Sequence, residues 1–198
     1  TVGRFARSRG KITLSLDQTE QELLSQSITE FIELLQYDAP APVAAEPASD
    51  DPFEVWERSF GHVPGIEDEL PDEDRDPIIA RLFPRAYPDD PEASSDFSRF
   101  TDAEQRRAKI EAAARALRDL GDLRGGTVRI HTDHLDAWLK TLNNLRLVLA
   151  VMLDINDEVS HSEAAQRPES DPRAWLYQFY GWLGWMLESL LECLVQGE

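Results

Sequence analysis

The chain has 198 residues, of which 41% are hydrophobic, so it is long enough to bury the core of one sizeable domain. Its formal net charge of −18 disfavours binding of the whole chain along nucleic acid or an anionic membrane, because attraction to phosphates supplies most non-specific affinity. Its one cysteine excludes an internal disulfide bond and a zinc site with several cysteine ligands, and a reducing cytoplasm is the expected location.

The first predicted elements are a short strand and a long helix. Residues 11–16 alternate apolar and polar side chains, as a half-buried strand does. Asp17 and Glu20 then have the spacing of a capping box, so a helix is expected over residues 18–37. Helical periodicity predicts that its buried stripe consists of Leu24, Ile28, Phe31 and Leu35.

The next stretch, residues 38–75, is rich in proline, alanine and acidic residues and cannot continue a helix. We interpret it as a linker or cover segment inside one domain that spans residues 1–198. Acidic runs are usually solvated loops, and an acidic docking surface is the alternative interpretation. Phe53, Trp56 and Phe60 interrupt the acids, which favours packing of the segment on the body of the domain.

The remaining sequence predicts several helices and a second strand. The expected elements are short helices near residues 77–84 and 91–100, a helix capped by Thr101 that runs to about residue 120, a strand over 127–131, a long helix capped by Thr132 over about 133–155, a polar loop, and a last helix from about residue 172 to 194. The two strands are expected to pair, because a lone strand would leave its backbone groups unsatisfied. The predicted fold is therefore mostly α (α+β), a bundle of about four main helices with a small two-stranded β ribbon.

No catalytic motif is recognisable in the sequence. It has neither a glycine-rich phosphate loop that opens a helix nor a G-x-S-x-G elbow. His131 and His134 have Asp133 and Asp136 nearby, but their spacing crosses the start of a helix, which favours surface or capping roles over metal ligation. We therefore expect no enzyme activity, no catalytic residue, no cofactor and no metal site.

Arg146 falls within the apolar stripe of the helix predicted over residues 133–155. An unpaired buried charge is strongly unfavourable, so the simpler interpretation is an ion pair with an acid of another helix, such as Glu188 or Glu192. The alternative is an anion-binding arginine in a ligand-binding protein or an enzyme.

The last helix has an ordinary leucine-rich side and an unusual polar side. It is too short and too interrupted by polar residues to span a bilayer. Trp185 and Gly181 lie on the polar side, and Trp175 and Trp182 lie at its border. Because exposed aromatic side chains often mark contact surfaces, we interpret these four residues as candidates for binding the acidic segment, a second copy in a homodimer, or a protein partner.

Cys193 lies at the same border and is expected to be partly exposed. Glu192 is its neighbour, and nothing nearby in the sequence lowers its thiol pKa, which favours a passive thiol. The alternative is a redox-sensitive thiol that forms an intermolecular disulfide or a mixed adduct.

Basic residues gather at the beginning of the sequence, where Arg4, Arg7, Arg9 and Lys11 precede any acid. A second basic group, in the helix predicted over residues 101–120, is nearly balanced by acids. These groups allow local contact with DNA. Because the net negative charge of the chain repels DNA phosphates, such binding should be weak and should fall with salt. No complete helix-turn-helix motif accompanies them.

Four strings, "IARLFPRAYPDD", "FSRFTDAEQRRAKIEAA", "AWLKTLNNLRLVLAVML" and "YGWLGWMLESLLECL", together with the entry "ITLSLDQTEQELL", resemble the actinobacterial family catalogued as domain of unknown function 2017. The resemblance covers nearly the whole chain except about residues 38–75. It implies a cytoplasmic protein without established enzyme activity. Genes of the family commonly lie near those for the Clp protease adaptor and for sulfur-carrier-dependent cysteine synthesis, and some members are described as oxidative-stress transcription regulators.

The resemblance thus implies a non-enzymatic regulatory protein that acts through contacts with other proteins, among them the transcription machinery. A Clp-protease-linked adaptor is the alternative that rests on gene neighbourhood, and a ligand-binding protein or enzyme that uses Arg146 is the third. The single cysteine departs from a switch that needs an intramolecular disulfide, so redox sensing by this chain would need two chains or a small thiol.

Overall fold

The computed structural model describes residues 3–37, 76–84, 91–171 and 173–195, with the backbone alone for residues 91–100. The predicted linker or cover segment, residues 38–75, lies outside the described residues. Within the described ranges the elements are β1 (Arg4–Ser8), β2 (Lys11–Ser15), α1 (Gln18–Tyr37), α3 (Pro77–Leu82), α4 (Pro91–Gly121), β3 (Thr127–Ile130), a 3₁₀ turn (Thr132–His134), α5 (Leu135–Met152), α6 (Glu158–Ala165) and α7 (Ala174–Val195).

The sheet has three antiparallel strands in the order β1-β2-β3, so the prediction of a two-stranded ribbon was incomplete. The predicted pairing of β2 with β3 is confirmed, with Ile12 opposite Ile130. Strand β1 was missed because, apart from Phe5, its side chains are small or charged. Arg9 and Gly10 join β1 to β2 with φ angles of 49° and 75°, the left-handed conformation that a two-residue hairpin turn needs.

Helix α1 begins and ends where the sequence predicted. The capping box forms, since the Glu20 N–H donates to Asp17 at 2.8 Å and the Asp17 N–H donates to Glu20 at 2.9 Å. The predicted stripe is buried. The short helix α3 also forms, with the Asp76 carboxylate accepting from the N–H of Ile78 at 2.8 Å.

Two predicted helix starts were wrong, and one helix was missed. Helix α4 is one continuous helix, and Thr101 lies inside it rather than at a cap, because no proline or glycine interrupts residues 92–120. His131, not Thr132, accepts from the Asp133 N–H ahead of α5, at 3.4 Å. Helix α6 occupies part of the predicted polar loop, where Asp157 and Ser160 form a capping box.

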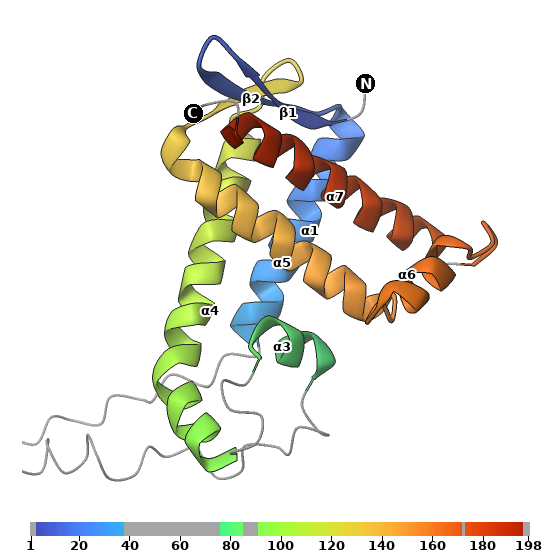
Figure 1. The fold of residues 1–198 in the computed structure, drawn as a ribbon. Coiled ribbons are helices and arrows are strands. Elements are labelled where there is room, and N and C mark those ends of the chain that lie inside the picture. Colours follow the sequence, from blue (N-terminus) through green and yellow to red (C-terminus); the bar gives the residue numbers. More distant parts are fainter. Residues whose placement is uncertain (1–2, 38–75, 85–90, 172, 196–198) are drawn as a thin grey trace, which may run out of the picture.

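Helix α5 is the central element, since it packs against α1, α3, α4 and α7. Figure 1 shows the sheet across one end of the helices, beside the C-terminal end of α7. The ring of Phe5 in β1 meets the fully buried Trp138 of α5 edge-on, with centroids 5.3 Å apart. The Phe5 N–H also donates to the Ser189 hydroxyl of α7 at 3.0 Å, which ties the sheet to the helical body.

Of the described helices, none combines the length and the apolar character that a membrane-spanning segment requires.

Candidate functional site

A groove with a volume of about 500 Å³ lies between α1, α5 and α7. Gln26, Ser27 and Glu30 of α1 supply its polar lining. The rest of the lining is apolar and consists of Leu23, Phe31, Leu34, Leu145, Val148, Leu149, Met152, Trp175, Leu176 and Phe179. An apolar floor with a few polar groups is the usual character of a binding site, and we refer to this site as the α1/α5/α7 groove.

Two large side chains of this groove remain open to solvent. Trp175 is 54% exposed and Met152 is 46% exposed. The ring of Trp175 stacks on Phe179 at 6.5 Å between centroids, and Phe179 stacks on Trp182 at 5.8 Å. The stacking holds Trp175 in a defined position beside the groove, as suits an aromatic anchor for a partner.

The structure does not bring the four predicted partner-binding residues into one patch. Trp175 lines the α1/α5/α7 groove, and Trp182 is half-buried against Phe179. Trp185 is 44% exposed and is rotated about 80° around α7 from Trp175, at 100° per residue. Gly181 is exposed, and no described side chain lies within 4 Å of the position of its missing Cβ.

The sequence did not point to Leu23, Leu34, Val148 and Met152 as site residues. All four look like ordinary members of amphipathic helices, and only the crossing of α1, α5 and α7 opens a groove between them. A weak signal existed for Met152, because methionine is an adaptable side chain that is common at protein-binding surfaces.

Cys193 is buried, with 3% of its surface exposed, so the expectation that it is partly exposed was wrong. Strand β1, which the sequence analysis missed, packs against α7, and Arg7 donates to the Cys193 carbonyl at 2.8 Å. Burial raises the pKa of the thiol above its ordinary value; Glu192 adds to the rise and Arg7 opposes it. Because the thiolate is the reactive form, a buried thiol with a raised pKa is expected to react slowly.

Arg146 is not held in an ion pair with Glu188 or Glu192, contrary to the simpler sequence interpretation. Both acids are exposed, and no carboxylate pairs with Arg146 in the part of the chain that the structure describes. Its guanidinium lies over the ring of Tyr180, with 4.6 Å between Cζ and the ring centroid. Its Nε atom is buried and has no hydrogen-bond partner among the described residues.

Gly184 explains how α7 accommodates this side chain. A Cβ at Gly184 would lie 3.5 Å from Arg146 Cζ, so the absence of a side chain leaves room for the guanidinium beside the helix. Gly184 thus admits a side chain of the same chain, whereas Gly181, a predicted partner-binding residue of the same helix, faces open space.

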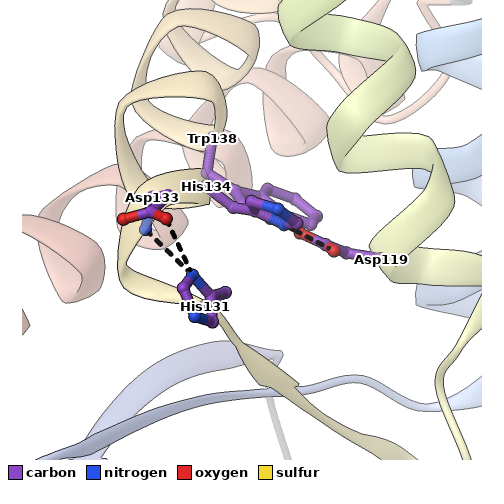
Figure 2. Close-up of polar contacts among 5 residues, drawn as sticks. All are labelled: Asp119, His131, Asp133, His134 and Trp138. Atoms are coloured by element: carbon purple, nitrogen blue, oxygen red, sulfur yellow. Dashed lines mark hydrogen bonds and ion pairs between the residues drawn. The ribbon is translucent and has the colours of Figure 1, made fainter.

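The histidines of the "HTDHLD" stretch serve local structure (Figure 2). His134 Nδ1 lies 2.9 Å from an oxygen of Asp119, and Trp138 Nε1 donates to Asp119 at 2.8 Å. His131 points to Asp133 instead, 3.4 Å away. No group of three or more potential metal ligands occurs among the residues that the structure describes.

The family model described as "Domain of unknown function (DUF2017)" matches residues 2–194. The chain belongs to this family. It is also 30% identical over 132 residues to proteins named "Oxidative stress regulator AosR" from Mycobacterium bovis and from two strains of Mycobacterium tuberculosis. This match covers 61% of the chain and 59% of the relatives, so it spans less than two thirds of their length. No solved structure matches the chain.

The sheet of this family member collects basic side chains from two distant segments. Arg4, Arg9 and Lys11 of the β1–β2 hairpin are exposed, as is Arg129 of β3. No acid lies between residues 3 and 16. The sheet is therefore locally positive in a chain whose net charge is −18.

Proposed function

We propose that this chain is a non-enzymatic regulatory protein of the oxidative-stress response that binds another protein in the α1/α5/α7 groove. The regulatory role is supported by the family and by the relatives named as oxidative stress regulators. The contact site is supported by a single observation, the exposed Trp175 and Met152 at an apolar groove of about 500 Å³.

The groove has the features of a site for an amphipathic helix. Its apolar lining comes from three helices, and an apolar helix face in such a groove is a common mode of peptide recognition. Glu30 contributes a negative charge to the lining, and the chain is strongly acidic overall. We therefore propose a partner helix with an apolar face and basic flanks, carried by a component of the transcription machinery.

In this proposal the chain does not itself detect oxidants. Its one cysteine is buried and has a raised pKa, which makes slow oxidation the expectation. The oxidant signal would reach the chain through the partner protein, or through a change in the amount of this chain in the cell.

Affinity purification from lysates of oxidant-treated cells tests this function. The wild-type chain is compared with Trp175→Ala and Met152→Ala, and Leu191→Ala serves as a matched control because Leu191 is 46% exposed outside the groove lining. We expect the wild type and the control to retain a component of the transcription machinery. Both groove variants should recover roughly tenfold less of it.

Circular dichroism of each variant separates lost binding from lost folding. An identical set of partners for all four proteins would contradict the groove. Recovery of the Clp ATPase or its adaptor, in place of a transcription component, would favour the alternative of a Clp-linked adaptor.

The basic sheet favours weak DNA contact as a second candidate function. Arg4, Arg9, Lys11 and Arg129 together could release a few counterions from a duplex. Fluorescence anisotropy with a labelled duplex should then show affinity that falls steeply with salt and falls further in Arg129→Gln. Affinity that does not depend on salt would exclude contact through this sheet.

A further inference from the structure

The guanidinium of Arg146 lines a second cavity, with a volume of about 300 Å³, which is distinct from the α1/α5/α7 groove. Its residues come from α3, α5, α6, α7 and the loop after α5. Leu147, Ala150 and Ile155 give it apolar walls, and the polar lining consists of Arg81, Asn143, Arg146, Asn156, Asp157, His161 and Tyr180.

Arg146 has unused hydrogen-bonding capacity in this cavity. Its Nε–H group is buried without an acceptor, and no carboxylate in the described residues neutralises its charge. The side chain as a whole is half-buried, so its charge is only partly hydrated, and the ring of Tyr180 compensates for only part of the hydration that it loses. A bound ion or water is a common explanation for a buried N–H group without an acceptor.

The charges around the cavity favour an anion with a single negative charge. Arg81, in the last turn of α3, adds a second guanidinium. Among the described residues of the lining, Asp157 is the one acid, and it is committed to the start of α6, where its Oδ1 accepts from the Ser160 N–H at 2.8 Å and from the Ser160 hydroxyl at 2.7 Å. Two arginines against one carboxylate give these described residues a modest positive excess.

The geometry of the guanidinium favours a carboxylate. One face of Arg146 is covered by the Tyr180 ring, and Gly184 leaves α7 close beside it. The edge of the planar guanidinium is therefore the part that can meet a ligand. Edge-on pairing of two N–H groups with two coplanar oxygens is the geometry in which arginine binds a carboxylate.

We propose that this cavity binds a small organic carboxylate through Arg146, with Arg81 as a second cationic contact. The amides of Asn143 and Asn156 would lie beside the polar substituents of the ligand. The site is separate from the partner-binding groove proposed above. It offers a way for a metabolite to adjust how α3, α6 and α7 pack on α5, because its residues come from all four helices.

Titration of the 198-residue chain with acetate, pyruvate and succinate, and with inorganic phosphate for comparison, tests the proposal. Nitrogen-15 NMR follows the Arg146 Nε–H signal, which is identified by its disappearance in Arg146→Lys. The expected result is a saturable shift of this signal with at least one carboxylate, together with a rise in melting temperature.

Three variants locate the site. Arg146→Met should abolish saturable binding without lowering the melting temperature of the free protein, and Arg81→Met should weaken affinity by roughly tenfold. Arg107→Met, which removes an exposed arginine of α4, is the matched control and should bind as the wild type does.

Several results would overturn the proposal. Absence of any saturable shift in the wild type, equal carboxylate binding by Arg146→Met, or tighter binding of phosphate than of every carboxylate would each do so. The NMR titration of the wild type decides the question even where Arg146→Met fails to fold. A groove variant such as Trp175→Ala should keep carboxylate binding, so failure of one proposal is distinguishable from failure of the other.

Discussion

The two ends of helix α5 treat buried polar groups in opposite ways. At the first turns, the Asp119 carboxylate, which is 8% exposed, accepts from Trp138 and lies within hydrogen-bonding distance of His134. Toward the other end, the Arg146 Nε–H has no acceptor and the guanidinium has no counterion among the described residues. The first arrangement is complete without any other molecule, whereas the second has an open position for one.

This difference separates polar groups that stabilise the fold from a polar group that the fold carries at a cost. A satisfied buried network contributes to stability, and removal of one member leaves the others without partners. A buried N–H group without an acceptor lowers stability until a ligand or water completes it. Mutation at the two ends should therefore change the free energy of unfolding in opposite directions.

The largest expected effect is at the satisfied end. Asp119→Ala should lower the free energy of unfolding by about 2–4 kcal/mol, because the indole N–H of the fully buried Trp138 loses its acceptor. Urea denaturation at neutral pH measures the change. Asp122→Ala, at an exposed position three residues further on, is the control; an equal loss in both variants would mean that the network adds no stability.

At the unsatisfied end, Arg146→Met should leave the free energy of unfolding unchanged or raise it by up to about 1 kcal/mol. The half-buried guanidinium has lost part of its hydration and its Nε–H has no acceptor among the described residues, so its removal offsets the lost contact with Tyr180. The same urea denaturation compares it with Arg107→Met. A loss above about 2 kcal/mol would show that Arg146 is a stabilising residue of the core.

Substitution of two glycines of α7 by alanine should give smaller changes in stability, which depend on how close each glycine lies to Arg146. Gly181→Ala should raise stability by about 0.5–1 kcal/mol, because alanine favours a helix and the added methyl meets no described atom within 4 Å. Gly184→Ala should raise stability by a smaller amount, since the added methyl would lie 3.5 Å from Cζ of the Arg146 guanidinium. Thermal melts of the two variants give the order, and a larger gain at Gly184 would argue against this placement of Arg146.

The smallest expected effect concerns the pH dependence of Cys193, a third buried polar group. Burial raises its pKa above the ordinary 9.0, so the folded chain holds the thiol proton more tightly than the unfolded chain does. The associated stability is fully present below the unfolded pKa and is lost as pH rises through the folded pKa. Alkylation by iodoacetamide should accordingly be slow at pH 8 and accelerate only above about pH 9 in the native protein.

Unfolded chain in urea is the control for that measurement and should react at the rate of an ordinary thiol. Rapid alkylation of the native chain at pH 8 would contradict both the burial of Cys193 and the proposal that this chain does not detect oxidants itself.

Local rules predicted the elements whose signals are local. Helix α1 was predicted from a capping box and a regular apolar stripe, and strand β2 from the alternation of apolar and polar side chains. Strand β1 and helix α6 were missed, because β1 is mostly charged and α6 buries only Ala164. Strand β1 depends on contact with α7, which is far away in the sequence and which a local pattern does not contain, whereas α6 is short and has little apolar periodicity to detect.

The candidate site was less accessible to sequence analysis. Helical periodicity placed Arg146 among apolar residues and Trp185 on the polar side, and both placements agree with the structure. The burial of Cys193 depends on the missed strand β1, and the α1/α5/α7 groove depends on how three helices cross. Neither can be read from the periodicity of a single helix.

The bonds between β1 and α7 set an order of events during synthesis. The Phe5 N–H and the Ser189 hydroxyl that accepts from it are 184 residues apart, and Arg7 reaches Cys193 across a similar interval. A ribosome makes the hairpin before α7, so the outer strand of the hairpin stays uncovered until α7 emerges. Contacts of such long sequence separation slow folding, so the nascent hairpin needs shielding during that interval.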